Sequence, residues 1–333
     1  MLVGIIGAGP LGLHMACTLA RKNIPYLVLE KGQPGQTIFN WPAHTRFHSA
    51  SDRIAIGGLP IQSPHHQQLP RDEYLSYLKQ VVKLQQLDLR PFEEVIGVEK
   101  QGENFHVQTR NLHRETNSYA FTHLVFATGT CHEPVLPSLP GIEQPQVKDT
   151  RFPLHYSFNR DLLVIGGRHS ALEYATRAYH AGARKVSICA RSDPFKAEHL
   201  KKELLDEVRR LVDGKKINLY TNSQVKIIHK NSAVLQHCDT LEETEVPAHW
   251  VIAACGYSTC YKLFGQLGIS LSPLNQAPVF DEQTMETNVE GSYVIGTAIA
   301  GNQRSQYHYF IENTLSHVSR AAAHISVSSR VPG

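Results

Sequence analysis

The stretch LVGIIGAGPLG, residues 2–12, decides the fold. Its apolar residues 2–6 are typical of a buried parallel strand, and they lead directly into the pattern G-x-G-x-x-G formed by Gly7, Gly9 and Gly12. In a dinucleotide-binding turn the first glycine permits the tight turn, the second lets the backbone approach a pyrophosphate, and the third lets the following helix pack on the strand. That helix directs its N-terminus at the phosphates. The stretch therefore predicts a nucleotide site.

A second apolar run, residues 26–29, predicts the next strand, and it ends in Glu30. The spacing from the glycine turn to this acid is close to the roughly 20 residues expected when a carboxylate binds the adenosine ribose of a dinucleotide. The alternative is a glycine-rich strand–helix turn that binds nothing. Because the strand, the glycines and the acid agree, we predict an adenosine ribose at Glu30.

The same strand–turn–helix pattern occurs again after the proline-rich residues 134–145. An apolar strand over residues 162–165 leads into the turn GGRHSA at 166–171, and apolar residues at helical spacing follow over 172–180. Another amphipathic helix, exposed to solvent, is predicted over 200–212. Two strand–turn–helix units in one chain predict a second dinucleotide site.

The strand after the second turn, residues 185–189, does not end in an acid. It is followed closely by Arg191, and folds that prefer NADP place cations there, where they bind the 2′-phosphate. Arg168 and Lys196 are candidates for supporting charge. The alternative for Arg191 is a solvated surface arginine in a strand-to-loop turn. We predict NADPH rather than NADH at this site.

Composition narrows the class of protein. The 333 residues include 33 basic and 30 acidic ones, without the Lys/Arg blocks that bind nucleic acid or membranes. No apolar run approaches the ~20 residues of a membrane helix, and residues 1–20 lack the basic start of a signal peptide. Six scattered cysteines do not make a disulfide framework, and the adjacent His65 and His66 have no acid or thiol at ligand spacing, so we expect no metal. A cytoplasmic, two-domain protein with small-molecule partners is expected.

Three further segments resemble the two-dinucleotide flavoprotein superfamily. They are FATG at residues 126–129, ACGY at 254–257 and YVIG at 293–296. The resemblance implies an α/β fold of two Rossmann-like, three-layer dinucleotide-binding domains of the FAD/NAD(P) type. It implies an FAD domain at residues 1–153 and 258–333, with the NADPH domain, 154–257, inserted into it. A bound flavin can accept hydride from a nicotinamide that comes and goes, so two sites imply a relay.

Within that superfamily the chain is similar to the bacillithiol disulfide reductase-like group of thioredoxin-reductase-fold proteins. The likeness rests on LPRDEYLSYL at 69–78, VIGGRHSA at 164–171, and AGN at 300–302 followed by FIEN at 310–313. It implies FAD and NADPH as cofactors. For FAD the implied binding residues are Gly7, Gly9, Pro10, Leu11, Gly12, Glu30, Lys31, Trp41, Val95, Ala127, Thr128, Gly129 and Gly296. For NADPH they are Gly166, Gly167, Arg168, His169, Ser170 and Arg191.

Two other groups of residues are candidates for contact with the flavin. Phe39, Trp41 and Phe47 lie in the segment that wraps the flavin ring in the resembling families. One interpretation is an aromatic that stacks on the ring, and the other is packing under a long loop. Glu312 and Asn313 lie near the start or middle of the predicted C-terminal helix, whose N-terminus would stabilise the charge of a reduced flavin.

The cysteines leave the electron acceptor open. Thioredoxin reductases pass electrons through a C-x-x-C pair, which this chain lacks. Cys255 and Cys260 have the C-x4-C spacing of glutathione-reductase-like enzymes, although those enzymes carry it in the first FAD segment. The alternative is that Cys255 replaces the threonine of the usual A-T-G turn and Cys260 is an ordinary apolar residue. With Cys131 they are the candidate catalytic residues. The resembling group often carries a cysteine at the position of Leu11, so a mechanism that uses that thiol is excluded.

We therefore predict an NADPH-dependent, FAD-containing oxidoreductase of the disulfide-reductase type, which passes hydride from NADPH to flavin and electrons to a small-molecule or protein acceptor. A low-molecular-weight or protein disulfide is the candidate acceptor. Two alternatives stay open. Flavin-dependent monooxygenases also resemble the chain at residues 7–12, 127–129 and 170–171, although their F-x-G-x-x-x-H motif is missing. The other alternative is a flavoprotein that senses the redox state without turnover. Related folds commonly dimerise, which makes a homodimer a candidate assembly.

Overall fold

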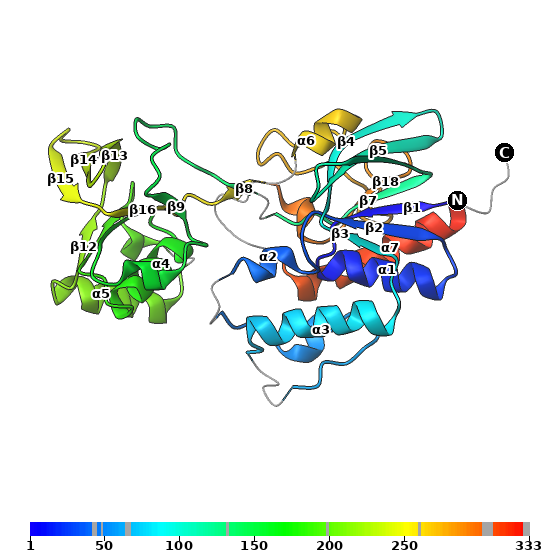
Figure 1. The fold of residues 1–333 in the computed structure, drawn as a ribbon, viewed down its shortest axis with the longest axis horizontal. Coiled ribbons are helices and arrows are strands. Elements are labelled where there is room, and N and C mark those ends of the chain that lie inside the picture. Colours follow the sequence, from blue (N-terminus) through cyan, green and yellow to red (C-terminus); the bar gives the residue numbers. More distant parts are fainter. Residues whose placement is uncertain are drawn as a thin grey trace. The chain divides into compact units, whose positions relative to one another are not determined.

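The computed structural model describes residues 1–41, 45–47, 49–63, 68–130, 133–197, 200–258, 261–301 and 309–328. The chain divides into two compact units (Figure 1). Unit 1 comprises Met1–Glu133 and Ser258–Gly333, and unit 2 comprises Pro134–Tyr257. The chain passes between the units at β8 (Glu133–Pro134) and β17 (Tyr257–Ser258), and these two strands pair with each other. Unit 2 is therefore inserted into unit 1.

Unit 1 is built on a five-stranded parallel sheet in the order β18-β7-β1-β2-β3. β1 lies in the middle with all of its residues buried, as its apolar sequence predicts for a strand covered on both faces. The predicted strand 26–29 lies in β2. The bounds are β1 (Val3–Ile6), β2 (Tyr26–Glu30), β3 (Leu89–Pro91), β7 (His123–Phe126) and β18 (Ser292–Val294).

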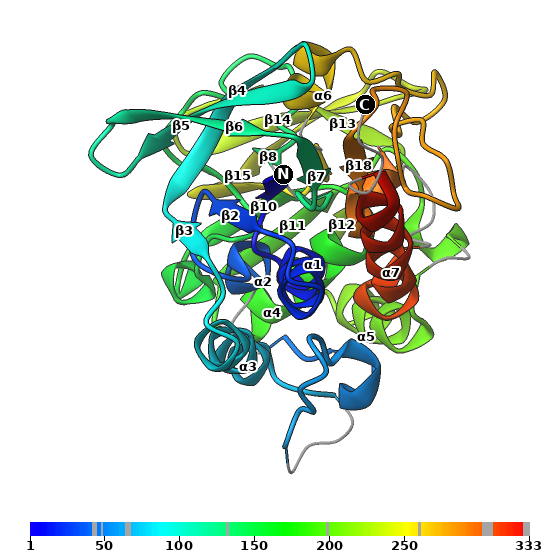
Figure 2. The ribbon, with the colours of Figure 1, turned by 90° about the vertical axis from the view of Figure 1, so that its right-hand side faces the viewer.

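Helices and a second sheet complete unit 1. α1 (Pro10–Arg21) contacts both α3 (Arg71–Leu84) and α7 (Ile311–Ser328), and Figure 2 shows α1 beside α7. The second sheet is antiparallel, and its first strand contacts α6 (Tyr261–Leu267). Its strands are β4 (Glu93–Gln101), β5 (Asn104–Asn111) and β6 (Thr116–Phe121), and the short helices of the unit are α2 (Gln36–Phe39), η1 (Ser51–Ile54) and η4 (Gly296–Ala300).

Unit 2 repeats the architecture with a five-stranded parallel sheet in the order β12-β11-β10-β16-β9. The predicted strand 162–165 lies in β10, the predicted helix 172–180 lies in α4, and the predicted helix 200–212 corresponds to α5, which begins two residues later, at Lys202. An antiparallel sheet, β13-β14-β15, adds a second layer. The bounds are β9 (Val147–Asp149), η2 (Leu154–Ser157), β10 (Asp161–Ile165), α4 (His169–His180), β11 (Lys185–Cys189), η3 (Pro194–Lys196), α5 (Lys202–Asp213), β12 (Ile217–Tyr220), β13 (Ser223–Ile228), β14 (Ser232–His237), β15 (Glu243–Pro247) and β16 (Trp250–Ala253).

Unit 2 begins earlier in the chain than the sequence predicted. The predicted boundary falls after residue 153, whereas unit 2 begins at Pro134. Residues 134–153 belong to unit 2 in the structure. The reason is β9, whose three residues pair with Val251–Ala253 of β16 and extend the sheet of unit 2. So short a strand, which contains a Lys and an Asp, gives no periodic signal in the sequence.

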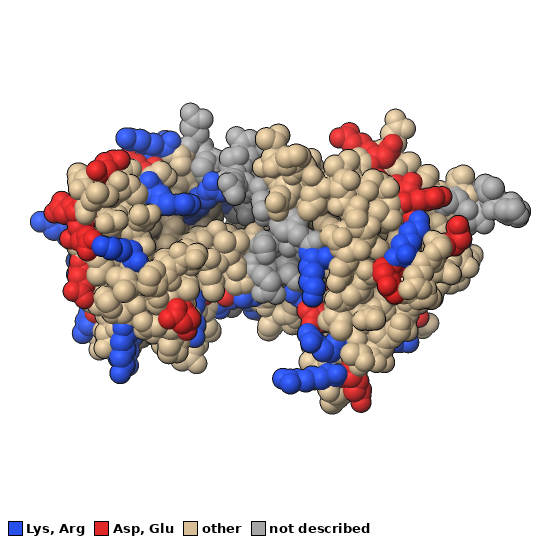
Figure 3. Space-filling view, turned by 90° about the horizontal axis from the view of Figure 1, so that it is seen from above, with Lys and Arg blue, Asp and Glu red and all other residues tan. Residues whose placement is uncertain are grey.

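The surface of the described residues is mixed in charge, and Figure 3 shows basic and acidic side chains interspersed on one face. Among these residues no helix is long and apolar enough to cross a membrane. Within the same part of the chain, no three His, Cys, Asp or Glu side chains come together in a way that could hold a metal ion.

Candidate functional site

The first glycine turn lies between the carboxyl end of β1 and α1. Gly7 has φ +104°, a backbone conformation that residues with a side chain rarely adopt, and a Cβ there would lie 2.7 Å from the Ala127 carbonyl oxygen. A Cβ on Gly12 would lie 1.9 Å from the Gly7 carbonyl oxygen. By contrast, the place of a Cβ on Gly9 has nothing within 4 Å. The first and third glycines thus close the turn, and the second leaves the backbone open to a ligand.

The N-terminus of α1 is suited to bind an anion. Gly9 is the N-cap residue, no side chain caps the helix, and its first turn holds no acidic residue. Pro10 begins the helix, where the N–H that it lacks would have had no partner within the helix. The unsatisfied N–H groups and the positive end of the helix dipole favour an anion such as a pyrophosphate.

Glu30 ends β2 and is buried. Its carboxylate oxygens accept hydrogen bonds from the backbone N–H groups of Ala8 (2.7 Å) and Gly32 (2.8 Å). Burial raises the pKa of Glu30, and the two N–H groups and the charge of Lys31 oppose this shift without cancelling it. Lys31 itself is exposed. The carboxylate is fixed against the glycine turn, where its remaining lone pairs can accept the hydroxyl groups of a ribose.

Among the described residues of unit 1, four buried side-chain atoms have no hydrogen-bond partner, on Thr128, Ser292, Glu312 and His317, and two of them lie next to the sheet of the first glycine turn and in α7. The hydroxyl oxygen of Thr128, just after β7, and the Oε2 atom of Glu312, in the first turn of α7, accept or donate no hydrogen bond. The neighbouring Asn313 accepts a hydrogen bond from the backbone N–H of Phe310 (2.7 Å). Buried polar atoms without partners are rare, and such sites are often completed by a ligand or water. Thr128 and Glu312 therefore fit a site that is completed by a polar ligand such as a flavin nucleotide.

The predicted glycines after β7 and β18 lie in turns with a left-handed backbone conformation, which glycine adopts readily. Gly129 has φ +69°, and the place of its Cβ is 3.5 Å from the Thr297 hydroxyl oxygen. Gly296 has φ +68° and begins η4, and a Cβ there would lie 3.0 Å from the Leu11 side chain. Leu11, on the first turn of α1, therefore lies against η4. The structure thus brings the turn at 127–129, η4 and the first glycine turn together.

The candidate aromatic residues pack on one another. Trp41 lies 5.2 Å from Phe47 between ring centroids, and Phe47 lies 4.6 Å from Tyr74. Phe39 is exposed and lies 5.7 Å from the Arg71 guanidinium carbon. Trp41 is partly buried against the core of unit 1, as is Val95 of β4. Contact of Trp41 or Val95 with a flavin stays a prediction.

The second glycine turn follows β10. Gly166 has φ +138°, and a Cβ there would lie 2.6 Å from the Ala254 carbonyl oxygen. α4 begins at His169 with Arg168 as the N-cap residue, and it has neither a side-chain cap hydrogen bond nor an acidic residue in its first turn. Arg168 and the following Ser170 are exposed, and His169 is half-buried. This N-terminus is therefore also open to a phosphate.

The loop after β11 lies against this turn. The place of a Cβ on Gly167 is 2.8 Å from the Ala190 side chain and 3.8 Å from the Ser192 carbonyl oxygen. Arg191, between those two residues, is exposed, as is Lys196 of η3. A basic loop beside a helix N-terminus is suited to an anionic substituent next to a pyrophosphate.

The candidate cysteines are only partly described. Cys131 and Cys260 lie outside the described residues. Cys255 follows β16 and is exposed, with its Sγ 3.8 Å from the Ile165 carbonyl oxygen. Desolvation raises the pKa of the Cys255 thiol, and the charge of Arg191 opposes this shift. Cys189 is buried, and burial raises the pKa of its thiol to about 12.

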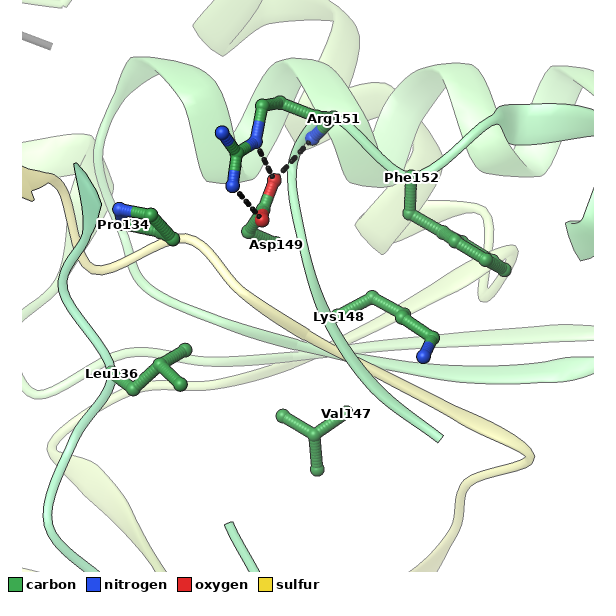
Figure 4. A pocket seen from close by; sticks show the side chains of 7 residues that line it. All are labelled: Pro134, Leu136, Val147, Lys148, Asp149, Arg151 and Phe152. Atoms are coloured by element: carbon green, nitrogen blue, oxygen red, sulfur yellow. Dashed lines mark hydrogen bonds and ion pairs between the residues drawn. The ribbon is translucent and has the colours of Figure 1, made fainter. Parts of the chain in front are cut away.

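A pocket that was not predicted from the sequence lies in unit 2 (Figure 4). Its volume is about 350 Å³. At its rim the Asp149 carboxylate accepts three hydrogen bonds from Arg151, drawn as dashed lines in the figure. The sequence did not indicate these residues, because β9 was not recognised as a strand and the position of its end was therefore unknown. The lining residues are Pro134, Leu136, Val147, Lys148, Asp149, Arg151 and Phe152.

Residues 4–296 match the family described as pyridine nucleotide-disulphide oxidoreductase, so the chain belongs to this family. It is an FAD-dependent oxidoreductase that uses a pyridine nucleotide, with the two-domain fold predicted from the sequence.

Comparison with individual relatives identifies the group within this family that the chain resembles. The chain is 32% identical to the bacilliredoxin reductase Bdr of Bacillus subtilis (strain 168), over 97% of this chain and 96% of that protein. The structure of the bacillithiol disulfide reductase Bdr (YpdA) from Bacillus cereus has a TM-score of 0.91 at 30% identity, covering 98% of this chain and 99% of that one. The Staphylococcus aureus protein of the same name has a TM-score of 0.89 at 30% identity, with 99% of each chain covered. The predicted similarity to this group is confirmed.

Proposed function

We propose that this protein oxidises NADPH and reduces a disulfide, with FAD bound in unit 1 and NADPH in unit 2. One observation carries the choice of NADPH. The same turn is built twice, but the second turn has Ala190 at the position of the Glu30 carboxylate, and the exposed cation of Arg191 follows it. A carboxylate suits ribose hydroxyl groups, whereas an arginine suits the 2′-phosphate that distinguishes NADPH from NADH.

The side chains and backbone have positioning roles in this proposal. Glu30 holds the adenosine ribose of FAD, the N-termini of α1 and α4 bind the two pyrophosphates, and Arg191 binds the 2′-phosphate. FAD supplies the chemistry that joins the two half-reactions, because it accepts a hydride and gives up electrons to a disulfide. The overall reaction consumes NADPH, a proton and a disulfide, and it yields NADP⁺ and two thiols.

A low-molecular-weight or protein disulfide is the proposed acceptor. The printed names of the relatives refer to bacillithiol disulfide and to bacilliredoxin, and the family is named for disulphide oxidoreductases. The chain has no C-x-x-C pair and carries Leu11 inside its first glycine turn. The electrons therefore leave the flavin without a thiol at either of these places.

The test is anaerobic mixing of the FAD-loaded protein with NADPH or NADH, while flavin absorbance is followed. We expect fast bleaching by NADPH and at least about tenfold slower bleaching by NADH at equal concentration, since one charge-assisted contact is worth roughly 1.5–3 kcal/mol. Arg191→Ala should slow the reaction with NADPH and leave that with NADH unchanged. Arg210→Ala, on α5 of the same unit, is the matched control. No bleaching by either nucleotide would refute the proposal.

The acceptor is then identified by adding one oxidant at a time to the reduced protein. Rapid reoxidation by bacillithiol disulfide or by an oxidised bacilliredoxin, with two thiols formed for each NADPH, is the expected result. Reoxidation by oxygen alone with formation of an oxygenated product would support a monooxygenase instead. A protein that is reduced by NADPH but reoxidised by none of these would favour a redox sensor.

A further inference from the structure

The glycine turn of unit 1 is tied to α2 through the backbone. Ala8 lies between Gly7 and Gly9, and its carbonyl oxygen accepts a hydrogen bond from the backbone N–H of Gly35 (2.9 Å), the N-cap residue of α2. The N–H of Ala8 donates to Glu30 (2.7 Å). Both backbone groups of Ala8 are therefore held, and the position of α2 contributes to the conformation of the turn.

The short helix α2 depends on its neighbours for its position. It has four residues, and an isolated helix of fewer than about 12–15 residues is marginal in water. Its start packs tightly on α3, because a Cβ on Gly35 would lie 2.8 Å from the Leu78 side chain and 2.9 Å from that of Leu75. Contacts with α3 therefore set the place of α2.

Arg71, the first residue of α3, holds the other end of α2. Its Nη1 atom donates hydrogen bonds to the carbonyl oxygens of Phe39 (3.0 Å) and Trp41. The Phe39 carbonyl, on the last residue of α2, is one of those that a helix end leaves without a partner in the helix. The Arg71 guanidinium carbon also lies 5.7 Å from the centre of the Phe39 ring. One cation therefore fixes both the end of α2 and Trp41, which follows it.

Apart from these bonds, the environment of Arg71 compensates its charge poorly. Only 12% of its side chain is exposed, so the charge has lost most of its contact with water. It lies in the first turn of a helix, where the helix dipole disfavours a cation. Its ion-pair partner Asp72 is 65% exposed, and solvent weakens such a pair. The carbonyl oxygens of Phe39 and Trp41 are therefore the main partners of the buried charge.

We propose that Arg71 is a positioning residue for FAD. Its guanidinium group fixes the end of α2, and α2 holds the Ala8 carbonyl through Gly35, which keeps the glycine turn in the conformation that receives the pyrophosphate. Arg71 acts through α2 and Ala8 and is not a catalytic residue. The inference rests on the proposed binding of FAD at the first glycine turn.

The test compares Arg71→Met with Arg71→Lys. Methionine keeps an unbranched side chain without donors, whereas the lysine ammonium can replace Nη1, because a single nitrogen serves both carbonyls. FAD and ADP are each titrated calorimetrically into the flavin-free, full-length protein. ADP contains the pyrophosphate and the adenosine ribose of FAD but lacks its flavin half.

We expect Arg71→Met to raise the Kd of both FAD and ADP by roughly tenfold, as for the loss of one charge-assisted hydrogen bond, and Arg71→Lys to restore most of the affinity for both. Arg46→Met is the matched control, because Arg46 is exposed and donates to the Gln68 carbonyl (3.1 Å) instead of to α2. It should affect neither ligand. Should Arg71→Met not fold, Arg71→Gln is a second uncharged variant with the same expected direction.

Three results would overturn the role of Arg71. The first is wild-type affinity for FAD in the uncharged variants. The second is weaker binding of FAD with unchanged binding of ADP, since Arg71 would then act on the flavin half and not through the glycine turn. The third is an equal loss in Arg71→Lys and Arg71→Met, which would assign the effect to packing. If Glu30→Gln leaves the Kd of FAD unchanged, the proposed place of FAD fails first.

Discussion

The two glycine turns of this protein are built on the same hydrogen-bond frame. In each, the first glycine donates its N–H to the last or penultimate residue of the neighbouring strand, and the A-x-G segment donates back to the first strand. The bonds are Gly7 to Leu29 (2.8 Å) and Ala127 to Ile6 (2.9 Å) in unit 1, and Gly166 to Cys189 (2.9 Å) and Ala254 to Ile165 (2.9 Å) in unit 2. Because the backbone frame is the same in both turns, any difference in nucleotide preference between them must come from other residues.

The differences between the turns lie in side chains. Gly12 of the first turn corresponds to Ala171 of the second, and the buried acid Glu30 corresponds to Ala190, which the exposed Arg191 follows. At the first turn, backbone N–H groups hold the buried carboxylate of Glu30, whereas at the second turn the cationic side chain of Arg191 is exposed to solvent. These features suit a nucleotide that stays bound in unit 1 and one that exchanges in unit 2.

Gly12→Ala is the variant with the largest expected effect. Its methyl group would lie 1.9 Å from the Gly7 carbonyl oxygen, and overpacking costs typically about 1–3 kcal/mol. Because relief requires α1 to move away from the turn, we expect purified Gly12→Ala protein to lose most of its FAD. Ala171→Gly, at the corresponding place in α4, should keep FAD and lose only about 1 kcal/mol of stability. Flavin absorbance and thermal unfolding measure both effects, and full FAD content in Gly12→Ala would contradict the assigned role.

Glu30→Gln is expected to weaken FAD binding by roughly ten- to a hundredfold, because hydrogen bonds to a charged group are worth about 1.5–3 kcal/mol. The amide can accept only at one of the two oxygen positions that now serve Ala8 and Gly32. Titration of the flavin-free protein with FAD gives the Kd. Glu99→Gln, on the exposed part of β4, is the matched control. Equal FAD affinity in Glu30→Gln and wild type would remove Glu30 from the site.

The buried carboxylates of the two units should respond to pH in opposite directions. Burial raises the pKa of Glu30, so in flavin-free protein its contribution to stability is present at low pH and is lost as pH rises through the raised pKa. The Arg184 hydrogen bonds lower the pKa of Asp161 below 3.8, so its contribution is present at neutral pH and is lost as pH falls through the lowered pKa. Urea denaturation across pH should lose the first trend in Glu30→Gln and the second in Asp161→Asn. The same pH profile in wild type and both variants would contradict these assignments.

Cys255→Thr has the smallest expected effect. It gives the second turn the threonine that the first turn carries at Thr128, and the raised pKa of the Cys255 thiol makes it a poor nucleophile at neutral pH. We expect stability within about 0.5 kcal/mol of wild type and unchanged disulfide reduction. Normal reduction of the flavin by NADPH with loss of disulfide reduction would instead assign Cys255 a redox role.

The parts of the molecule predicted from sequence are those with strong local signals. Residues 2–12 and 162–171 combine apolar strands with glycines whose backbone conformation is special, and the structure places both stretches in strand–turn–helix units. Glu30 was found because an acid at a set spacing ends an apolar strand. The strand β9 was not predicted, because three residues are too few to show a sequence pattern. It is defined only by its pairing with β16, about a hundred residues further along the chain.

By itself, the sequence determined two glycine turns of the dinucleotide-binding type, their order in the chain, and the acid that ends the second strand of the first unit but not of the second, since each depends on residues near one another in the chain. Only the tertiary structure decided which residues face those turns. The Ala127 and Ala254 carbonyl oxygens lie against Gly7 and Gly166, and the Thr128 hydroxyl oxygen and the Oε2 atom of Glu312 are buried without hydrogen-bond partners. The hydroxyl groups of Thr150 and Tyr257 likewise come within 2.9 Å of each other, because parallel pairing aligns the ends of distant strands.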